Sequence, residues 1–526
     1  MPSLVTKKFR IQNAKKLLES IALENSIYYM FIGKASSFTD DNNPPTPTNT
    51  IQAFEYDSYR DIIAMKRIQS SDASLVIPRY NWTSGNVYKS YSDKDTTPYA
   101  ETLSPTSANT SYVYTDDNNV YRCIDNNRGG ASTVKPTGTS TAIITTSDGY
   151  RWKFLYKIST ADALKFITTN FIPAKSLTEN DGSTQWAVRT NAANGAIHHI
   201  VISSNGSNYL SISNTIASVS NSTVLSLTGN ISTSDDIYRD SAIFISSGLG
   251  SGQLRRINSY VGATKTITVN GAFTTTPNTS SRYIIAPLVL ILGDSGSTPG
   301  TKATAYVSNC AGGQIRKITL VSNGLNYSTA NVRIIASQGS GAVATAIISP
   351  PNGHGYDPAD ELGASNIMLN VRVIGSEGNS FPSNNNFRMI GVLKDPLLRS
   401  GDPATASTLD QCTKLGVAGV TGDFSADEII TGSSSSARGQ FIRFDPDVGT
   451  RTGIVRVNRI TTGGTGLTFS PGETITGSIS GKTAIVTSVD KAAVREYTGD
   501  ILYVENRKPI NRAQDQIEDL KIVVRF

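Results

Sequence analysis

The chain is poor in charge, and this shortage limits what it can be. Of its 526 residues only 17% are charged, against roughly 25% in soluble domains generally. With 38% hydrophobic residues it can build a core, so it does not resemble a highly charged disordered chain. The net charge of +6 is spread over the chain without a dense basic run. We therefore expect no nucleic-acid partner.

Cysteine and long apolar runs are also scarce. Cys123, Cys310 and Cys412 form an odd, scattered set without a CxxC pair, which argues against a disulfide framework or a zinc site. No apolar run approaches the ~20 residues of a membrane helix, and the N-terminal region has no signal-peptide core. We expect synthesis and folding in a cytoplasm, with no membrane partner.

Ser, Thr and Asn take the place of the missing charge, together with 44 Gly and 22 Tyr. Thr and Tyr favour a pleated, half-buried surface, while Gly and Asn favour tight turns. The predicted fold class is mainly β with minor α, built from many short connections.

Two segments have apolar residues at helical spacing. The first stripe consists of Ile11, Ala14, Leu18 and Ile21, and the second of Ile62, Met65 and Ile68. Both predict helices. The proline-rich stretch 43–47 between them predicts a loop.

Strand signals are stronger. From 150 to 158 aromatic or aliphatic residues alternate with Arg151, Lys153 and Lys157, which predicts one aromatic face and one largely charged face. Asp148-Gly149 before this stretch is a good hairpin-turn pair. Alternation from 520 to 526 predicts a closing strand.

The chain contains two internal repeats. Residues 195–209 match 313–327, and each copy reads as a strand that ends in an Asn-Gly turn. Residues 424–433 match 469–478. The copies lie in two blocks rich in Ser, Thr and Gly, at 176–365 and 401–495, which we interpret as inserted small β domains.

Motifs that could carry chemistry lack their partners. Gly293-Asp294-Ser295-Gly296-Ser297 is similar to a serine-protease nucleophile segment, but no His stands in a suitable setting, so a turn is favoured. His198 and His199 are neighbours on a predicted strand and point to opposite faces, which favours exposed polar positions over a metal site. Asp445 could open a calcium loop, but Arg456 stands where the closing Glu belongs. We predict no catalytic residue, no metal site and no cofactor.

Six short segments nevertheless follow one another in a recognisable order. They are Val5-Thr6-Lys7-Lys8-Phe9-Arg10, Val76-Ile77-Pro78-Arg79-Tyr80-Asn81-Trp82, Tyr121-Arg122-Cys123-Ile124-Asp125, Asp148-Gly149-Tyr150-Arg151-Trp152, Phe387-Arg388 with Asp395-Pro396-Leu397, and Tyr503-Val504-Glu505-Asn506-Arg507-Lys508-Pro509-Ile510. Together they resemble the baseplate wedge subunit of T-even-type phages, the family of the eighth gene product. The segment 244–266 is similar to β modules that recur in phage virion proteins.

The resemblance implies a layered β-sandwich core with helical and loop extensions, formed by 1–175, 366–400 and 496–526 and interrupted by the two inserted blocks. It also implies a homodimer in the tail baseplate of a virion, in contact with other wedge proteins and assembled in the host cytoplasm. Interface candidates are Arg79, Tyr80, Trp82, Tyr150, Trp152, Tyr503, Glu505, Asn506, Arg507 and Pro509. For the last five a satisfied turn between core strands is an equal alternative, and for Tyr80 and Trp82 core packing is favoured.

The predicted function is therefore that of a structural scaffold of the baseplate wedge, without enzyme activity. One alternative is a host-surface protein, such as a fibre or adhesin, whose repeated modules bind glycan. Another is a tailspike that cleaves polysaccharide, which would need two carboxylates about 5–10 Å apart.

Overall fold

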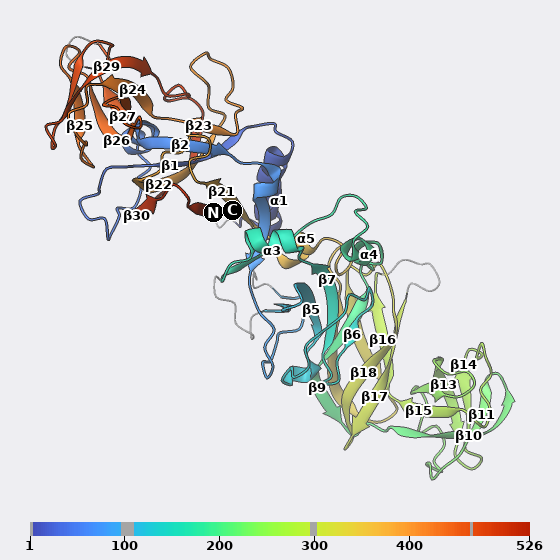
Figure 1. The fold of residues 1–526 in the computed structure, drawn as a ribbon. Coiled ribbons are helices and arrows are strands. Elements are labelled where there is room, and N and C mark those ends of the chain that lie inside the picture. The colour runs from blue at the N-terminus through green and yellow to red at the C-terminus, as the bar shows by residue number, and fades with distance from the viewer. Residues whose placement is uncertain (1–3, 96–109, 295–301, 463–466) are drawn as a thin grey trace. The chain divides into compact units, whose positions relative to one another are not determined.

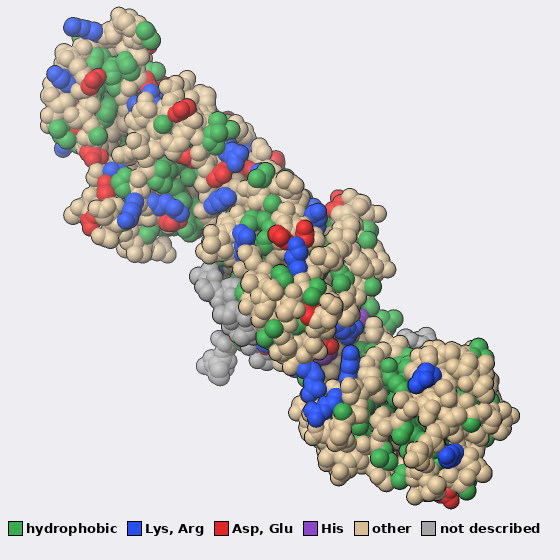
Figure 2. All heavy atoms as spheres, turned by 60° about the horizontal axis from the view of Figure 1, so that its bottom comes forward, with side chains coloured by type: hydrophobic (Ala, Val, Ile, Leu, Met, Phe, Trp, Pro, Cys, Tyr) green, Lys and Arg blue, Asp and Glu red, His purple; other side chains and the backbone are tan. Residues whose placement is uncertain are grey.

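The computed structural model describes residues 4–95, 110–294, 302–462 and 467–526. The chain forms two compact units, Met1–Val76 with Ser365–Phe526 (unit 1) and Ile77–Ala364 (unit 2). Antiparallel sheets and two closed barrels dominate both, so the prediction of a mainly β fold is confirmed (Figure 1). Figure 2 shows one face of the molecule, on which charged side chains occur in small separate groups between backbone and uncharged side chains.

The division of the chain differs from the predicted one. Residues 77–175 were grouped with the N-terminal and C-terminal segments, but they belong to unit 2. The reason is their own aromatic core, in which Tyr121 and Trp152 pack together with Val188 of the block 176–365. This core needs a side chain from the block that was interpreted as an insertion.

Unit 1 contains a five-stranded antiparallel sheet in the order β23-β2-β1-β22-β30. Its strands are β1 (Tyr28–Gly33), β2 (Ile62–Arg67), β22 (Asn385–Lys394), β23 (Thr408–Asp410) and β30 (Asp500–Arg512). The segments 1–76, 366–400 and 496–526 thus meet in one sheet. Beside it lie the hydrogen-bonded strands β31 (Ile517–Arg525), β21 (Asn366–Ile374) and β3 (Ala73–Pro78). The predicted closing strand is present as β31.

The predicted helix through Ile62, Met65 and Ile68 is wrong, because Ile62–Arg67 is β2. This strand lies between β1 and β23, and its first four residues are buried. A strand buried on both faces has no polar alternation, so its apolar run can mimic helical spacing.

The first predicted helix is confirmed as α1 (Lys7–Ala22), which buries Ile11, Ala14 and Ile21. Thr6 caps it, since the Thr6 hydroxyl accepts from the N–H of Phe9 at 3.2 Å. The predicted loop at 43–47 is also present. The other helical segments are η1 (Ile51–Asp57), α2 (Ser58–Asp61), η2 (Ser70–Asp72), η4 (Asn127–Gly129), α3 (Thr160–Phe166), α4 (Thr184–Thr190) and α5 (Pro358–Leu362). Within the described ranges, no helix has the length and apolar character to cross a membrane.

Unit 2 is built on three antiparallel sheets, ordered β4-β5-β7-β6, β18-β17-β16-β19 and β20-β9. Their strands are β4 (Tyr112–Tyr114), β5 (Asn119–Asp125), β6 (Ile144–Thr145), β7 (Arg151–Lys157), β9 (Ile197–Ser207), β16 (Leu288–Gly293), β17 (Ala303–Ala311), β18 (Gln314–Asn323), β19 (Ala330–Ile335) and β20 (Ser340–Ile348), with the short β8 (Phe171–Pro173) apart from them. The strand predicted over 150–158 is β7, and Asp148-Gly149 forms its hairpin turn with β6. Its charged face is not a solvent face, however, because Lys153 is buried and Arg151 half-buried.

The copies of the first repeat are β9 and β18 with their flanking residues. The N–H of Tyr209 donates to the carbonyl of Gly313 at 3.0 Å, and the N–H of Tyr327 donates to the carbonyl of Gly195 at 3.1 Å. Each copy thus accepts a backbone hydrogen bond from the other copy at equivalent positions. The expected Asn-Gly turn follows β18, whereas β9 continues through Gly206 as far as Ser207.

Each inserted block contains a six-stranded closed barrel (Figure 1). In unit 2 the barrel strands are β10 (Ile212–Asn221), β11 (Val224–Leu227), β12 (Ala242–Ser247), β13 (Leu254–Val261), β14 (Thr266–Asn270) and β15 (Arg282–Ala286). In unit 1 they are β24 (Thr413–Ala418), β25 (Ile429–Gly432), β26 (Arg438–Pro446), β27 (Gly453–Thr461), β28 (Thr474–Gly477) and β29 (Thr483–Asp490). Each barrel encloses its own hydrophobic core. Closure leaves no free sheet edge.

The copies of the second repeat contain the paired strands β25 and β28 of the unit 1 barrel, and the glutamate of each copy reaches the other copy. Glu428 (0% exposed) accepts hydrogen bonds from the N–H groups of Ile479 and Ser480 at 3.0 Å. Glu473 (4% exposed) accepts from the N–H groups of Ser434 and Ser435 at 3.3 and 3.1 Å. Each copy therefore provides the buried carboxylate for the turn of the other.

Glycine is required beside both carboxylates. A Cβ at Gly432 would collide with Glu473, and a Cβ at Gly477 would collide with Glu428. The repeated Glu and Gly are thus parts of one contact, in which backbone donors of one copy reach a buried carboxylate of the other.

We predict that Glu473→Gln lowers the free energy of unfolding of this barrel by about 2–3 kcal/mol, because buried N–H donors would face an amide NH₂ group. Glu428→Gln should have an equal effect by the reciprocal geometry, and Glu19→Gln on exposed α1 should change stability by less than about 0.5 kcal/mol. Urea unfolding measures all three. Equal stability of Glu473→Gln and the unmodified chain would contradict the prediction.

The same carboxylate predicts a dependence on pH. Burial tends to raise the pKa of Glu473, but hydrogen bonds from Ser435 and Ser470 outweigh it and hold the pKa below its ordinary value of 4.5. The stabilisation is therefore complete above pH 4.5 and is lost as the pH falls through the lowered pKa. The melting temperature of the unmodified chain should therefore fall as the pH is lowered below 4.5. In Glu473→Gln this part of the pH dependence should be absent.

Candidate functional site

Two of the predicted interface residues belong to the core of unit 2. Tyr150 and Trp152 are 0% exposed, and their rings stack at a centroid distance of 5.4 Å. Tyr88 contacts the Trp152 ring edge-on at 5.6 Å. Both residues therefore hold the aromatic core together and cannot contact a partner directly.

Arg79, Tyr80 and Trp82 of the neighbouring segment are half-buried, and Tyr80 and Trp82 pack against the same core. The indole N–H of Trp82 donates to the Ser132 hydroxyl at 3.1 Å. Arg79 donates to the carbonyl of Thr168 at 3.1 Å and lies over the ring of Tyr114, 5.2 Å from its centroid. These contacts agree with core packing, the interpretation favoured for Tyr80 and Trp82.

The C-terminal candidates lie on β30, an edge strand that pairs with β22 alone among the described strands. Tyr503, Glu505 and Arg507 alternate along it and share one face. The Tyr503 hydroxyl donates to Glu505 at 2.9 Å, and Arg507 forms an ion pair with Glu505 at 3.0 Å. Burial, followed by the carboxylate of Glu505, raises the pKa of Tyr503 to about 12, so it remains a neutral phenol.

The other two candidates, Asn506 and Pro509, fit the position of β30 at the edge of its sheet. The Asn506 side chain donates to the carbonyl of Pro45 at 2.9 Å and so holds the loop beside the strand. Pro509 is exposed and lacks an N–H, which an edge strand tolerates and an inner strand does not. The motif is thus part of a strand and not a turn between two core strands.

Arg512, at the end of β30, was not identified from the sequence. It is 0% exposed and donates to Glu518 at 2.8 Å, to the carbonyl of Pro382 at 3.0 Å and to the carbonyl of Gly375 at 2.6 Å. It joins β30, β31 and the segment 375–382. No local pattern distinguishes it from exposed arginines, because its partners come from other parts of the chain.

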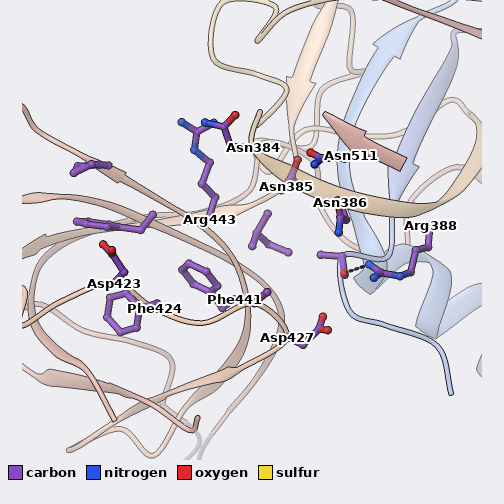
Figure 3. Close-up of a pocket in the computed structure, with 15 residues that line it drawn as sticks. Asn384, Asn385, Asn386, Arg388, Asp423, Phe424, Asp427, Phe441, Arg443 and Asn511 are labelled. Atoms are coloured by element: carbon purple, nitrogen blue, oxygen red, sulfur yellow. Dashed lines mark hydrogen bonds between the residues drawn. The ribbon is translucent and has the colours of Figure 1, made fainter. Parts of the chain in front are cut away.

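A polar groove of about 790 Å³ lies between the end of the five-stranded sheet and the barrel of unit 1 (Figure 3). Its labelled polar side chains are Asn384, Asn385, Asn386, Arg388, Asp423, Asp427, Arg443 and Asn511. Three of them have partners within the unit: Arg388 binds Asp41 at 2.8 Å, Asp427 accepts from Ser37 at 2.6 Å, and Arg443 donates to the Ser383 hydroxyl at 2.7 Å. Asn385 differs, since it is 8% exposed and both its amide atoms lack a hydrogen-bond partner in the described part of the chain.

The motifs considered for chemistry have structural roles. Asp294 accepts from the N–H groups of Ser328 and Thr329 at 2.9 and 2.8 Å and so caps a turn, while Ser295–Ser297 lie outside the described residues. Asp445 pairs with Arg456 at 2.8 Å, so the cation in the loop is the arginine of the chain itself.

The two neighbouring histidines do point to opposite sides. His199 pairs with Asp125 at 3.3 Å, while the ring of His198 lies 5.8 Å from that of His354. They are half-buried and not exposed as expected, because Asp125 on one face and His354 on the other lie against them. No three His, Cys, Asp or Glu side chains of the described ranges lie close enough to hold a metal ion.

No protein-family model matches the chain, and no curated protein matches it. A role for the chain is therefore argued from its motif segments and from the geometry of the described residues.

We predict that Arg512→Met lowers the free energy of unfolding of unit 1 by about 3–5 kcal/mol, because Glu518 would remain as a buried carboxylate without its cation. The matched change Arg507→Met, at a side chain 40% exposed, should cost less than about 1 kcal/mol. Chemical denaturation followed by circular dichroism separates the two. Similar effects of both changes would show that Arg512 does not join these segments.

Proposed function

We propose that this chain is a structural subunit of a phage tail baseplate wedge, where it forms a homodimer and joins neighbouring wedge proteins. The proposal is supported above all by β30. The most specific of the six motif segments forms this exposed edge strand, and its polar side chains bind one another in a row. A row of this kind maintains a surface and offers no nucleophile or base to a substrate.

The other motif segments support the same role. The segments at 121–125 and 148–152 lie on or beside β5 and β7, and Phe387-Arg388 lies on β22. Matched residues therefore build the sheets of both units, while the barrels in the two blocks have separate cores. A scaffold of this kind can acquire barrels without disturbing its sheets.

The homodimer would use the open edge of β30, because an edge strand offers unpaired N–H and C=O groups to a second copy. Leu502 on this strand is 49% exposed, so its apolar side chain is accessible to a second copy. A second copy that covers it would bury this apolar area.

We predict that Leu502→Arg weakens the homodimer at least about tenfold, since a charge would have to be desolvated at the interface, worth about 1.4 kcal/mol or more. Analytical ultracentrifugation of the full chain measures the dissociation constant. Ile517→Arg, on the exposed end of β31 (61% exposed), serves as the matched control and should leave it unchanged. A chain that is monomeric over the whole concentration range contradicts the homodimer.

The placement itself is tested by reconstruction of a purified virion and by co-purification with candidate wedge proteins. A chain located outside the tail would overturn the proposal.

The groove of Figure 3 favours a second candidate function, glycan binding at a host surface. Neighbouring amides with carboxylates and guanidinium groups suit hydroxyl groups, and Asn385 of the lining has two buried amide atoms without a hydrogen-bond partner among the described residues. Binding of the full chain to an immobilised glycan panel, lost in Asn385→Leu, would support this role. Equal binding by Asn385→Leu and the unmodified chain would reject this groove as the site.

A further inference from the structure

Unit 2 contains a cavity of about 300 Å³ with an unusual lining. Four of its side chains carry basic nitrogen atoms, namely Arg151, Lys153, His198 and His354. Two amides, Asn191 and Asn323, complete the polar part of the lining. Among the described residues, no Asp or Glu lines it.

Lys153 is the first residue whose surroundings indicate that this cavity binds a ligand. It lies on β7, only 6% of it is exposed, and burial lowers the pKa of its ammonium group. Its Nζ donates to the carbonyl of Thr141. The charge of Glu361 favours the ammonium form, but only one of the three ammonium donors has a hydrogen-bond partner among the described residues.

His198 is the second such residue. Its Nδ1 is buried and has no hydrogen-bond partner within the described residues. Burial, together with nearby His354, Arg151 and Lys153, lowers the pKa of His198 to about 3. The ring is therefore neutral at physiological pH, and one of its nitrogen atoms can donate a hydrogen bond to a ligand.

The nearest carboxylates are already bound. Glu361 of α5 accepts from Nδ1 of His354 at 2.6 Å and from the N–H of Gly355 at 2.8 Å, and Arg122 lies 3.5 Å away. Asp125, which is close enough to affect Arg151, pairs with His199 on the other side of β9. Glu361, whose charge acts on Lys153 and His198, is thus already bound to His354 and Gly355, and no carboxylate of the described residues lines the cavity itself.

We propose that this cavity is a binding site for a small oxyanion of the phosphate or sulfate class. Lys153 and Arg151 supply the positive charge, and His198 and the two amides supply neutral donors. The same cations would repel a metal ion placed between the two imidazole rings. The site does not depend on the role proposed for the chain in a baseplate.

Equilibrium dialysis of the full chain against radiolabelled inorganic phosphate tests the site directly. We expect one saturable site, with phosphate displaced by sulfate and not by chloride at equal ionic strength. Absence of saturable binding up to millimolar phosphate overturns the proposal, and so does displacement by chloride, which would show general charge screening.

Lys153→Met locates the site, with Lys157→Met as the matched control at the exposed end of the same strand. Phosphate should raise the melting temperature of the unmodified chain and of Lys157→Met, since a ligand that binds the folded state stabilises it. Lys153→Met should lose this rise. Its melting temperature without phosphate should not fall, because a buried charge with only one hydrogen-bond partner among the described residues is removed. An unchanged response to phosphate in Lys153→Met overturns the site.

His198 gives a second pair of variants if Lys153→Met does not fold. His198→Asn keeps a side-chain donor near the position of Nδ1, whereas His198→Leu does not. Phosphate affinity should fall at least tenfold in His198→Leu and stay within about threefold in His198→Asn, a difference of about 0.7 kcal/mol or more. Equal affinities of the two variants would exclude His198 as a ligand of the anion and overturn the site as described.

Discussion

The structure depends on exchanged hydrogen bonds between duplicated segments. In the unit 1 barrel the carboxylates of Glu428 and Glu473 each satisfy the turn of the other copy. In unit 2 the backbone of Tyr209 and Tyr327 does the same for Gly313 and Gly195. A buried polar group without a partner costs about 1–3 kcal/mol, so neither copy of a pair is stable in its native form without the other. Duplication here produced a closed structure and not a chain of separate repeats.

The sequence predicted the elements whose pattern is local. Helix α1 and strand β7 show their periodicity directly, and the repeats were visible as matching residues. It failed at β2, because burial on both faces removes the alternation that marks a strand. The mainly β class followed from composition, but the grouping of 77–175 did not, because Val188 completes that core from a distant part of the sequence.

For the candidate site residues, too, the sequence predicted only what a local pattern shows. Tyr503, Glu505 and Arg507 were identified by their motif, and they do lie together on one strand. Arg512 and Asn385 were missed, since their importance comes from burial and from partners, or missing partners, elsewhere in the chain. Lys153 was predicted on a charged face of β7, and only the structure shows that this face is covered and that the charge is buried.

The exchanged contacts also set an order for biosynthesis. While the ribosome is still translating the segment after Ser207, β9 has emerged, but Gly313, which binds Tyr209, has not been made. The first copy therefore lacks its partners until Tyr327 and then β20, the strand that pairs with β9, leave the exit tunnel. During this interval the closed barrel of β10–β15, whose strands are all local, can fold and keep the two copies close to each other.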